Sequence, residues 1–389
     1  MLIDFQVKNF RSFKDEVSFS MEIGLGVSEH ETSTIMLKDE ELLKSAVVFG
    51  GNANGKSNLI DAFALLKDLI LKPTSSENML LSTDTFAHNH KEVAFKIKFI
   101  KNENLYDYQL IYTSEEILME GLLVNGVENF KRIEQDIQVY PKQLKVLLPT
   151  IRKNQLFLFF AQNNNSPEAK QVFSWFVDNL IFVDTDDIDT SIFQKLTDET
   201  LKDKFIAFLR AADINISDIE ILERKQIHIY AEEKRNVYEL YSTHELENNE
   251  TFKLNFWDES AGTQAFMAIA IHLLLNESQQ DKVFLIDEFN RSFHLELAEA
   301  LIEIFNHEKQ RNQFIVTSHE LTLMDFDLRQ DQIWFAEKTR YGQTELFSVY
   351  DFEKAPKNGH KKYYLDGRYG AKPIIIKDLL QSFLGGQDG

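Results

Sequence analysis

The spacing of hydrophobic residues changes along the chain, and its first two patterns predict β-strands. Residues 2–23 alternate between apolar and polar positions, which predicts two strands joined around Arg11 and Ser12. Alternation returns between residues 93 and 124 and predicts an antiparallel meander with a turn at residues 101–104. The N-terminal part of the chain is therefore expected to contain an antiparallel β lobe.

A second pattern, short apolar runs separated by helical periods, predicts an α/β core. Residues 46–49 are continuously apolar, as in a buried strand, and apolar positions then recur at helical spacing from 58 to 71. The same features predict strands at 283–287 and 313–317, a loop that enters a buried helix within 259–275, and a helix at 295–306. They also predict a hairpin of 333–335 with 345–350 around Gly342. Such alternation of buried strands with helices is typical of an α/β fold.

The middle of the chain has a mixed pattern. Residues 170–180 and 198–212 have helical spacing, and residues 219–230 are typical of a strand pair. No heptad repeat is sustained, so no coiled-coil arm is expected. Residues 126–254 are therefore predicted to form a mixed, mainly helical insertion.

The composition is that of a globular protein without disulfides. The 389 residues are 43% hydrophobic, and the mean hydropathy is −0.29, as is usual for a globular protein. Cysteine is absent, and the N-terminus lacks the pattern of a secretory signal. We therefore expect a cytoplasmic protein that does not contact membranes.

Charge argues against one class of partner. The net charge of −20 disfavours nucleic acid spread over the whole surface but permits a local basic groove. Residues 353–389 are an exception, with seven Lys or Arg and four Asp or Glu. They predict a basic C-terminal tail, which is either solvated surface or a contact for a partner.

The strongest chemical signal is Gly-Gly-Asn-Ala-Asn-Gly-Lys-Ser at residues 50–57. This is the G-x-x-x-x-G-K-S pattern of phosphate-binding loops, placed between a predicted strand and a predicted helix. Glycines let backbone N–H groups surround phosphate oxygens, and the helix N-terminus adds partial positive charge. Lys56 is predicted to contact the β- and γ-phosphates, and the Ser57 hydroxyl to ligate Mg²⁺. The nucleotide-binding candidates in this segment are Gly50, Asn52, Asn54, Gly55, Lys56, Ser57 and Asn58.

Two acids at the end of the predicted strand 283–287 are candidates for hydrolysis. Asp287 is predicted to hold Mg²⁺, largely through water, and Glu288 to orient and deprotonate the attacking water. His319 ends the next predicted strand, where it would hydrogen-bond the γ-phosphate. The predicted catalytic residues are therefore Glu288, His319 and Lys56.

These motifs resemble those of ABC-type ATPases of the SMC/RecF/OLD group. The segments that carry the resemblance are NFRSF, FGGNANGKSNLIDAF, ESAGTQ, VFLIDEFNRSFH and TSHE. The later segments DQIWF and YLDGRYG narrow it to small ATPases of abortive-infection and phage-defence systems, of the RloA and AbiLi type and the ATPase half of PARIS. The resemblance covers about residues 1–125 and 255–372.

The resemblance implies a site shared between two chains, with ATP and Mg²⁺ as its ligands. Ser260 and Gly262, which precede a buried helix, would bind the γ-phosphate of ATP held by the other protomer. Arg11 would lie near the phosphates, and His294 would lie at the dimer interface. The site would be complete only in an ATP-sandwiched dimer or a larger homo-oligomer.

Some features depart from the pattern of the group. OLD-family nucleases carry a C-terminal TOPRIM domain, and the residues after His319 are too few for one. Residues 184–187, Asp-Thr-Asp-Asp, superficially resemble a nuclease motif but are interpreted as a helix N-cap and turn. The glutamine that senses Mg²⁺ in ABC-type sites is not clear, since Gln155 and Gln162 are both possible.

The expected fold class is α/β, a P-loop ABC-type ATPase head with an antiparallel β lobe and a mainly helical insertion. Residues 1–125 would form the N-terminal half of the head with the phosphate-binding loop, and residues 126–254 the insertion. Residues 255–350 would form the C-terminal half of the head, and residues 351–389 the basic tail.

The expected function is that of an ATP-hydrolysing sensor and scaffold in antiviral defence. It would control a separate nuclease or toxin, with nucleic acid or a phage protein as a possible trigger. One alternative is a DNA-repair or recombination ATPase of the RecF/SMC kind. A second alternative is an OLD-like nuclease that uses the region around Asp184.

Overall fold

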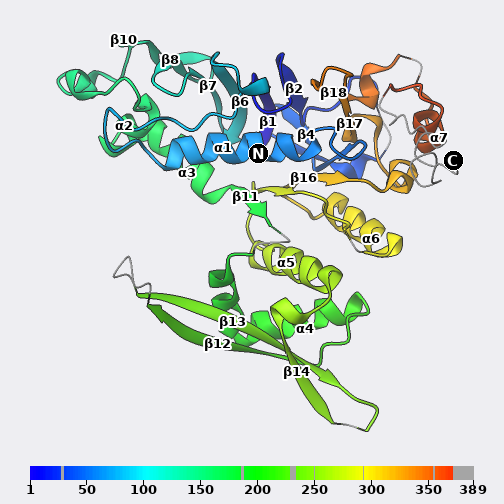
Figure 1. The fold of residues 1–389 in the computed structure, drawn as a ribbon. Helices are drawn as coiled ribbons and strands as arrows, with labels where there is room; N and C mark the ends of the chain where they lie inside the picture. The colour runs from blue at the N-terminus through cyan, green and yellow to red at the C-terminus, as the bar shows by residue number, and fades with distance from the viewer. Residues whose placement is uncertain are drawn as a thin grey trace, which may run out of the picture.

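The structure, a computed structural model, has a larger head and a smaller part below it in Figure 1. It describes residues 1–27, 30–184, 188–227, 234–248, 250–291, 293–353 and 355–370. The smaller part comes mainly from residues 190–258, so the chain leaves the head and returns to it.

A six-stranded sheet forms the centre of the head, in the order β11-β15-β16-β5-β17-β18. Its parallel strands are β11 (Leu180–Val183), β15 (Val283–Ile286), β16 (Gln313–Ser318), β5 (Ser45–Phe49) and β17 (Ile333–Lys338). The last strand, β18 (Thr344–Ser348), is antiparallel to β17. Helix α1 (Lys56–Leu71) covers one face, and α5 (Ala261–Leu275) and α6 (Leu295–Asn306) cover the other (Figure 1). Burial of both faces explains why β15 and most of β5 are continuous apolar runs.

A seven-stranded antiparallel sheet packs on α1 and forms the β lobe, in the order β10-β9-β8-β7-β6-β1-β2. Its strands are β1 (Leu2–Lys8), β2 (Val17–Ser20), β6 (Val93–Lys101), β7 (Asn104–Tyr112), β8 (Ile117–Val124), β9 (Val127–Ile133) and β10 (Asp136–Val139). Phe5 stacks on Phe63 of α1 with ring centroids 3.8 Å apart. The predicted N-terminal strand pair and the meander are confirmed, and the lobe continues beyond residue 125.

Residues 126–254 hold about as much strand as helix, so the insertion is mixed, as expected, rather than mainly helical. Strands β9 and β10 extend the β lobe, and β11 joins the central sheet. The other elements are α2 (Phe157–Asn163), α3 (Pro167–Asp178), α4 (Glu199–Ala211), β12 (Asp218–Ile227), β13 (Lys234–Glu245) and β14 (Thr251–Asn255). The strand pair expected at 219–230 is a single strand, β12, paired with β13, and residues 228–233 lie outside the described residues. The domain boundaries remain predictions.

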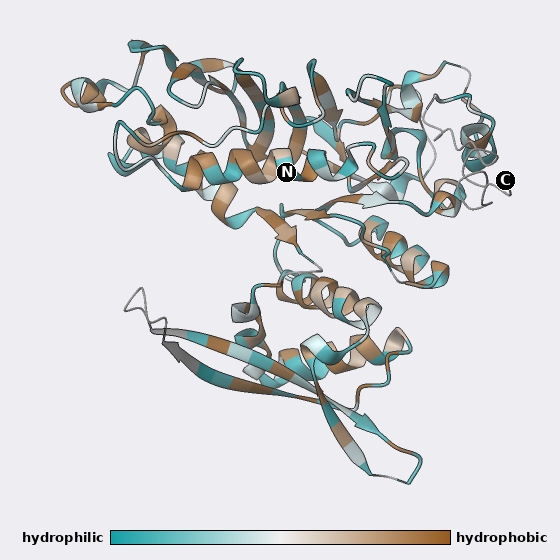
Figure 2. Cartoon of the chain, viewed as in Figure 1, coloured by the Kyte–Doolittle hydropathy of each residue, from teal (hydrophilic) through white to brown (hydrophobic). Residues whose placement is uncertain are grey.

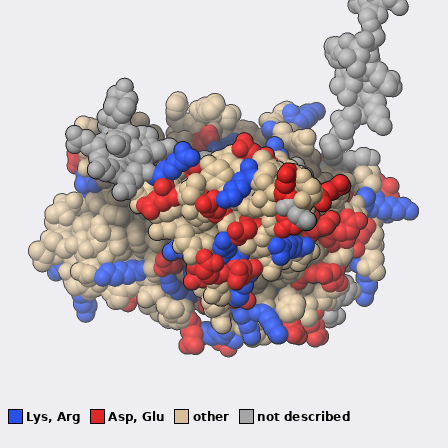
Figure 3. Space-filling model, turned by 90° about the horizontal axis from the view of Figure 1, so that it is seen from below, with Lys and Arg blue, Asp and Glu red and all other residues tan. Residues whose placement is uncertain are grey.

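The sheet β12-β13-β14 has one buried face and one solvated face. Ile219 and Leu240 are buried in the cluster that contains α4, whereas ion pairs such as Lys253–Glu220, 2.7 Å, lie on exposed positions. Apolar and polar residues accordingly alternate along β12 and β13 (Figure 2). On the face seen from below, acidic and basic side chains are interspersed (Figure 3). This two-faced pattern is that of an antiparallel sheet with one side in water.

The C-terminal elements close the head next to β17. The predicted hairpin of β17 and β18 around Gly342 is confirmed. After it, α7 (His360–Leu365) brings Tyr364 to 5.3 Å from the ring centroid of Phe335, and Tyr369 follows at 4.9 Å. The predicted tail thus begins as a packed segment, while residues 371–389 lie outside the described residues. A short hairpin, β3 (Thr34–Leu37) with β4 (Glu40–Leu43), completes the strands.

Within the described ranges, no helix combines the length and the apolar character that a membrane crossing needs.

Candidate functional site

The phosphate-binding loop lies between β5 and α1, where two glycines have no room for a side chain. A Cβ atom at Gly50 would lie 2.5 Å from the Ala336 carbonyl oxygen, and one at Gly55 would lie 2.4 Å from Thr344 Oγ1. Gly55 also has a φ of +95°, a conformation that other residues rarely adopt. Helix α1 begins at the next residue, Lys56, so its free N–H groups face the loop. Both glycines of the motif are therefore required by the geometry.

Lys56 is folded back over this loop and is only 4% exposed. Its Nζ donates to the carbonyl oxygens of Gly50 at 3.0 Å and Gly51 at 3.2 Å. Burial lowers the pKa of Lys56 to about 8, while the nearby carboxylates of Asp287 and Glu288 act in the opposite direction. The ammonium group is thus held at the loop by contacts that a phosphate could replace.

The two acids after β15 are held by a buried hydroxyl of the neighbouring strand. Thr317 Oγ1 donates to Asp287 Oδ1 and accepts from the backbone N–H of Glu288 at 2.7 Å. Glu288 has a φ of +46°, which is uncommon for a residue with a side chain. Because Thr317 is fully buried, it holds the Asp287 carboxylate and the backbone of Glu288 in place. Thr317 was not among the predicted site residues, although a hydroxyl residue two positions before His319 was a visible signal in the sequence.

Glu288, His319 and Lys56 form one hydrogen-bonded group. His319 Nε2 lies 3.2 Å from Glu288 Oε1, and Lys56 Nζ lies 3.2 Å from the ring nitrogens of His319. The structure therefore brings together the three residues proposed as catalytic, although they come from separate segments of the sequence. Arg291, which was not predicted, places its Nε 3.9 Å from Glu288 Oε2.

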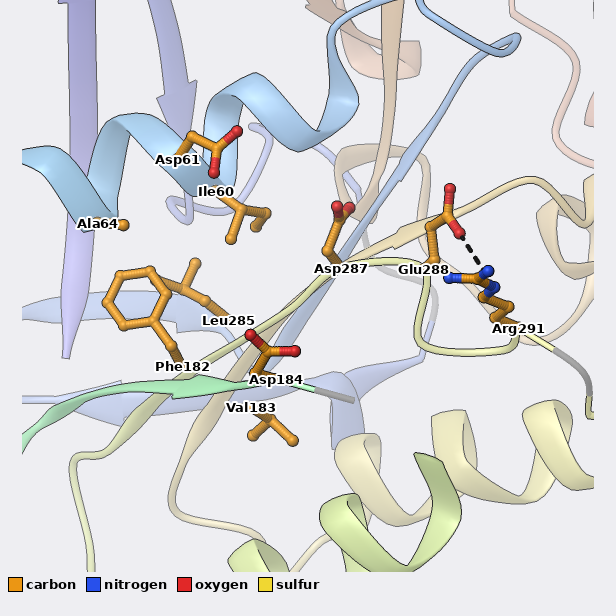
Figure 4. A pocket seen from close by; sticks show the side chains of 10 residues that line it. All are labelled: Ile60, Asp61, Ala64, Phe182, Val183, Asp184, Leu285, Asp287, Glu288 and Arg291. Atoms are coloured by element: carbon orange, nitrogen blue, oxygen red, sulfur yellow. Dashed lines mark ion pairs between the residues drawn. The ribbon is translucent and has the colours of Figure 1, made fainter. Parts of the chain in front are cut away.

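Two cavities adjoin this group. One of about 460 Å³ is lined by residues 52–58 with Glu288 and His319. Another of about 500 Å³ is lined by the carboxylates of Asp61, Asp184, Asp287 and Glu288, by Arg291, and by apolar residues of α1, β11 and β15 (Figure 4). Asp184 follows β11 and thus stands beside Asp287, because Val183 pairs with Ile286 in the parallel register. Residues 185–187, the rest of the Asp-Thr-Asp-Asp segment, lie outside the described residues.

Arg11 lies beside α1 and is held by two carboxylates. Its guanidinium donates to Asp61 and, at 2.7 Å, to Asp84 Oδ2. Arg11 does not line the cavity around the phosphate-binding loop. Its backbone has a φ of +46°, which is uncommon for a residue with a side chain. A role near the phosphates thus remains a prediction that requires these ion pairs to rearrange.

The loop at Ser260 is separate from the phosphate-binding loop of the same chain. Ser260 is exposed and is the N-cap of α5, where its Oγ accepts from the Thr263 N–H at 3.1 Å. Gly262 lies in the first turn of that helix, and neither residue lines the cavity around the phosphate-binding loop. His294 is the N-cap residue of α6.

Neither candidate for the Mg²⁺-sensing glutamine lies at this cavity. Gln155 accepts a hydrogen bond from Arg132 through its carbonyl oxygen, and Gln162 lies on α2, at the far end of the head from α6 in Figure 1. Neither lines the cavity around the phosphate-binding loop. The structure therefore does not bring either glutamine to the candidate site.

Comparison with protein families gives an independent finding. Residues 45–325 match the model of the family described as "AAA domain, putative AbiEii toxin, Type IV TA system". The chain belongs to this family. The match includes the phosphate-binding loop, the Ser260 loop, the acidic pair and His319, so the resemblance to ABC-type AAA ATPases of abortive-infection systems is confirmed. The predicted α/β class of a P-loop ATPase head is confirmed as well, and the structure has several sheets.

Solved structures of SMC heads also align with this AAA domain. One, the SmcHead bound to the C-winged helix domain of ScpA, is 12% identical, with a TM-score of 0.45 and coverage of 89% of this chain and 97% of that chain. The SMC head domain from Thermotoga maritima is 13% identical, with a TM-score of 0.41 and coverage of 89% and 98%. The Pyrococcus furiosus Smc head with an extended coiled coil, bound to the C-terminal domain of ScpA, is 13% identical, with a TM-score of 0.45 and coverage of 95% and 99%. No curated protein matches the sequence.

Proposed function

We propose that this AAA domain binds ATP with Mg²⁺ and hydrolyses it to ADP and phosphate. The observation that carries the proposal is the contact of Lys56, His319 and Glu288 at the mouth of a glycine-constrained loop. These are a cation for phosphate, a hydrogen-bonding imidazole and a carboxylate base within reach of one another. Family membership supports a nucleotide as the ligand.

The residues of the loop suit a triphosphate. The N–H groups at the start of α1 and the Lys56 ammonium would donate hydrogen bonds to phosphate oxygens. Lys56 would give up its present hydrogen bonds to the Gly50 and Gly51 carbonyl oxygens to do so. The Ser57 hydroxyl and the Asp287 carboxylate would hold Mg²⁺, since both are oxygen donors of the kind that this ion prefers. When bound, Mg²⁺ would supply neutralisation of the charge on the β- and γ-phosphates.

Glu288 is proposed as the base that takes a proton from the attacking water. Its backbone is fixed by Thr317, and its carboxylate lies between His319 and Arg291. His319 would leave Lys56 and turn its N–H from Glu288 to the γ-phosphate. This geometry favours hydrolysis over mere storage of the nucleotide.

The complete site is proposed to need two chains. Ser260 and Gly262 begin a helix whose exposed N-terminus can attract a phosphate, yet they do not reach the cavity of their own chain. ATP would therefore be sandwiched between Lys56 of one protomer and Ser260 of the other. His294, at the start of α6, is proposed to lie at the same interface.

The cellular role proposed is that of a cytoplasmic sensor and scaffold in antiviral defence. The description of the family, which names a type IV TA system, supports a role of this class. The ATP-bound dimer would be the form that a separate nuclease or toxin recognises, with nucleic acid or a phage protein as the trigger.

The biochemical proposal is tested by phosphate release from purified protein with and without Mg²⁺. We expect hydrolysis that needs Mg²⁺ and disappears in Lys56→Ala. In cells that carry the native locus, the same variant should abolish protection against phage. Intact protection would contradict the defence role, and sensitivity to DNA damage would favour the repair alternative. Metal-dependent DNA cleavage by the pure protein, lost in Asp184→Ala, would favour the nuclease alternative.

A further inference from the structure

Two hydroxyl groups from distant segments meet behind the phosphate-binding loop. Ser12 lies between β1 and β2, and Thr344 opens β18. Their hydroxyl oxygens are 2.7 Å apart, and the backbone N–H of Thr344 donates to the Ser12 carbonyl oxygen at 2.7 Å. We call this pair of side-chain hydroxyls the hydroxyl bridge. It joins the N-terminal loop to the C-terminal hairpin.

Both ends of the hydroxyl bridge contact the phosphate-binding segment. Asn58 Nδ2 lies 2.6 Å from Ser12 Oγ, and Thr344 Oγ1 lies 2.9 Å from the Asn54 carbonyl oxygen. Since a carbonyl only accepts and an amide nitrogen only donates, one direction lets all contacts form at once. Asn58 donates to Ser12, and Ser12 donates to Thr344. Thr344 then donates to Asn54.

This arrangement is buried and leaves little freedom to the loop. Thr344 is 1% exposed and Ser12 is 9% exposed. A Cβ atom at Gly55 would lie 2.4 Å from Thr344 Oγ1 and 2.7 Å from Ser12 Oγ, so the loop backbone rests directly on both hydroxyls. Linked hydrogen bonds in buried surroundings polarise and strengthen one another. The bridge therefore spans residues 54–58, the segment in which Lys56 and Ser57 lie.

We infer that Ser12 and Thr344 are positioning residues for nucleotide phosphate. They hold residues 54–58 in the conformation that directs backbone N–H groups at phosphate oxygens, without touching the nucleotide themselves. The inference rests on the proposed ATP site and extends it to the β17–β18 hairpin, about 290 residues away in sequence. A change in the β17–β18 hairpin should therefore alter the affinity of the phosphate-binding loop for nucleotide.

The test compares Thr344→Val with Thr344→Ser. Valine keeps the shape of threonine but removes the hydroxyl, and the dissociation constants for ATP and ADP should both rise about five- to tenfold. The factors should be similar, because both nucleotides place a β-phosphate in the loop. Serine keeps the hydroxyl and should bind within about twofold of wild type. As a matched control, Thr339→Val removes a buried hydroxyl of the same hairpin that has no hydrogen-bond partner among the described residues, and affinity should not change.

Ser12→Ala provides a second route should the valine variant fold poorly. It should weaken nucleotide binding about as much as Thr344→Val, and the double variant should lose less than the product of the two factors, since both break the same bridge. Wild-type binding combined with equal affinities for Thr344→Val and Thr344→Ser would overturn this inference alone. If the wild-type protein bound neither ATP nor ADP, the proposed function and this inference would both be wrong.

Discussion

The phosphate-binding loop and the Ser260 loop both precede a helix, but the first is packed against other segments of the chain and the second is exposed. The first is enclosed: Lys56 is 4% exposed, contacts His319 and lies on a loop backed by Thr344 and Ser12. The second lies at the surface, where Ser260 is exposed and caps its own helix. Trp257, three residues earlier, is 48% exposed.

This difference indicates that the two loops act in different steps of the proposed reaction. A loop that is preorganised within one chain can bind phosphate before any assembly takes place. A helix N-terminus left in water gains most when another molecule brings it a charge. The comparison therefore predicts that nucleotide binding and hydrolysis can be separated by mutating one loop or the other.

The largest expected effect comes from placing a charge in the exposed loop. In Gly262→Glu, the new carboxylate should repel the γ-phosphate presented by a second chain, so hydrolysis should fall to background. Binding of ATP at Lys56 of the same chain should remain close to wild type. Hydrolysis is measured by phosphate release, binding by equilibrium titration, and ATP-dependent dimerisation by light scattering.

Gly262→Ala is the control for size, because alanine suits the helix in which Gly262 lies. It should retain most of the activity. Mixing Gly262→Glu with Lys56→Ala protein should restore at most one composite site per dimer. Full activity of Gly262→Glu alone would show that the site is complete within one chain.

The next effect tests whether Glu288, which lines the cavity around the enclosed loop, carries the chemistry. Glu288→Gln keeps the shape and hydrogen-bonding capacity of the side chain but removes the base, so hydrolysis should slow roughly 10²-fold or more. ATP affinity should stay normal, and the ATP-bound dimer should accumulate as a larger species. Glu115→Gln, at an exposed position between β7 and β8, should behave as wild type. Turnover of Glu288→Gln near the wild-type rate would assign the base to another group.

The enclosed loop is also the region that the sequence predicted best. Buried strands such as β15 are read from continuous apolar runs, and the phosphate-loop motif fixes its own local geometry through Gly50 and Gly55. The insertion was harder, because β12 and β13 alternate apolar with charged residues and lie far from any motif. Their burial depends on helix α4, which no local pattern of the strands reveals.

Contacts between distant segments were not predictable from the sequence. Nothing in the local pattern around Thr344 indicates that it lies against Gly55, and nothing around Asp84 indicates a partner for Arg11. Periodicity reports which side of an element is buried, not which element covers it. Thr317 was predictable in part. The motif located the strand end, but not the hydrogen bonds of the Thr317 hydroxyl with Asp287 and with the Glu288 N–H.

Removing the cation of the enclosed loop should have a smaller effect when ATP affinity, rather than hydrolysis, is measured. Lys56→Ala should raise the dissociation constant for ATP at least roughly tenfold, the scale of a charge-assisted contact of about 1.5–3 kcal/mol. Lys44→Ala is a matched control, because Lys44 is 3% exposed and its Nζ donates to His307 and Glu308 carbonyl oxygens instead. Its loss should leave ATP affinity unchanged. Equal affinity in Lys56→Ala and wild type would remove Lys56 from the site.

The smallest effect concerns the charge of Lys56. Burial lowers its pKa from 10.5 to about 8, with Asp287 and Glu288 acting in the opposite direction. Only the charged form attracts phosphate, so ATP affinity should fall about fourfold between roughly pH 7 and 8.5, as the charged fraction of a single such group does. Bound phosphate favours the ammonium, so binding should take up a proton in this range. Calorimetry in buffers of different ionisation enthalpy measures that uptake.

Stability without nucleotide should change in the opposite sense. Because the pKa of Lys56 is lower in the folded chain than in the unfolded chain, the unfolded chain binds more protons between about pH 8 and 10.5. The contribution of Lys56 to the free energy of unfolding should therefore rise with pH across that range. Lys44 has a pKa that burial also lowers to about 8, so both measurements are made in Lys44→Ala, where the fourfold loss of affinity should persist. Affinity that does not change between pH 7 and 8.5 would show that Lys56 stays charged, and the enclosed loop would then hold its cation more firmly than its burial implies.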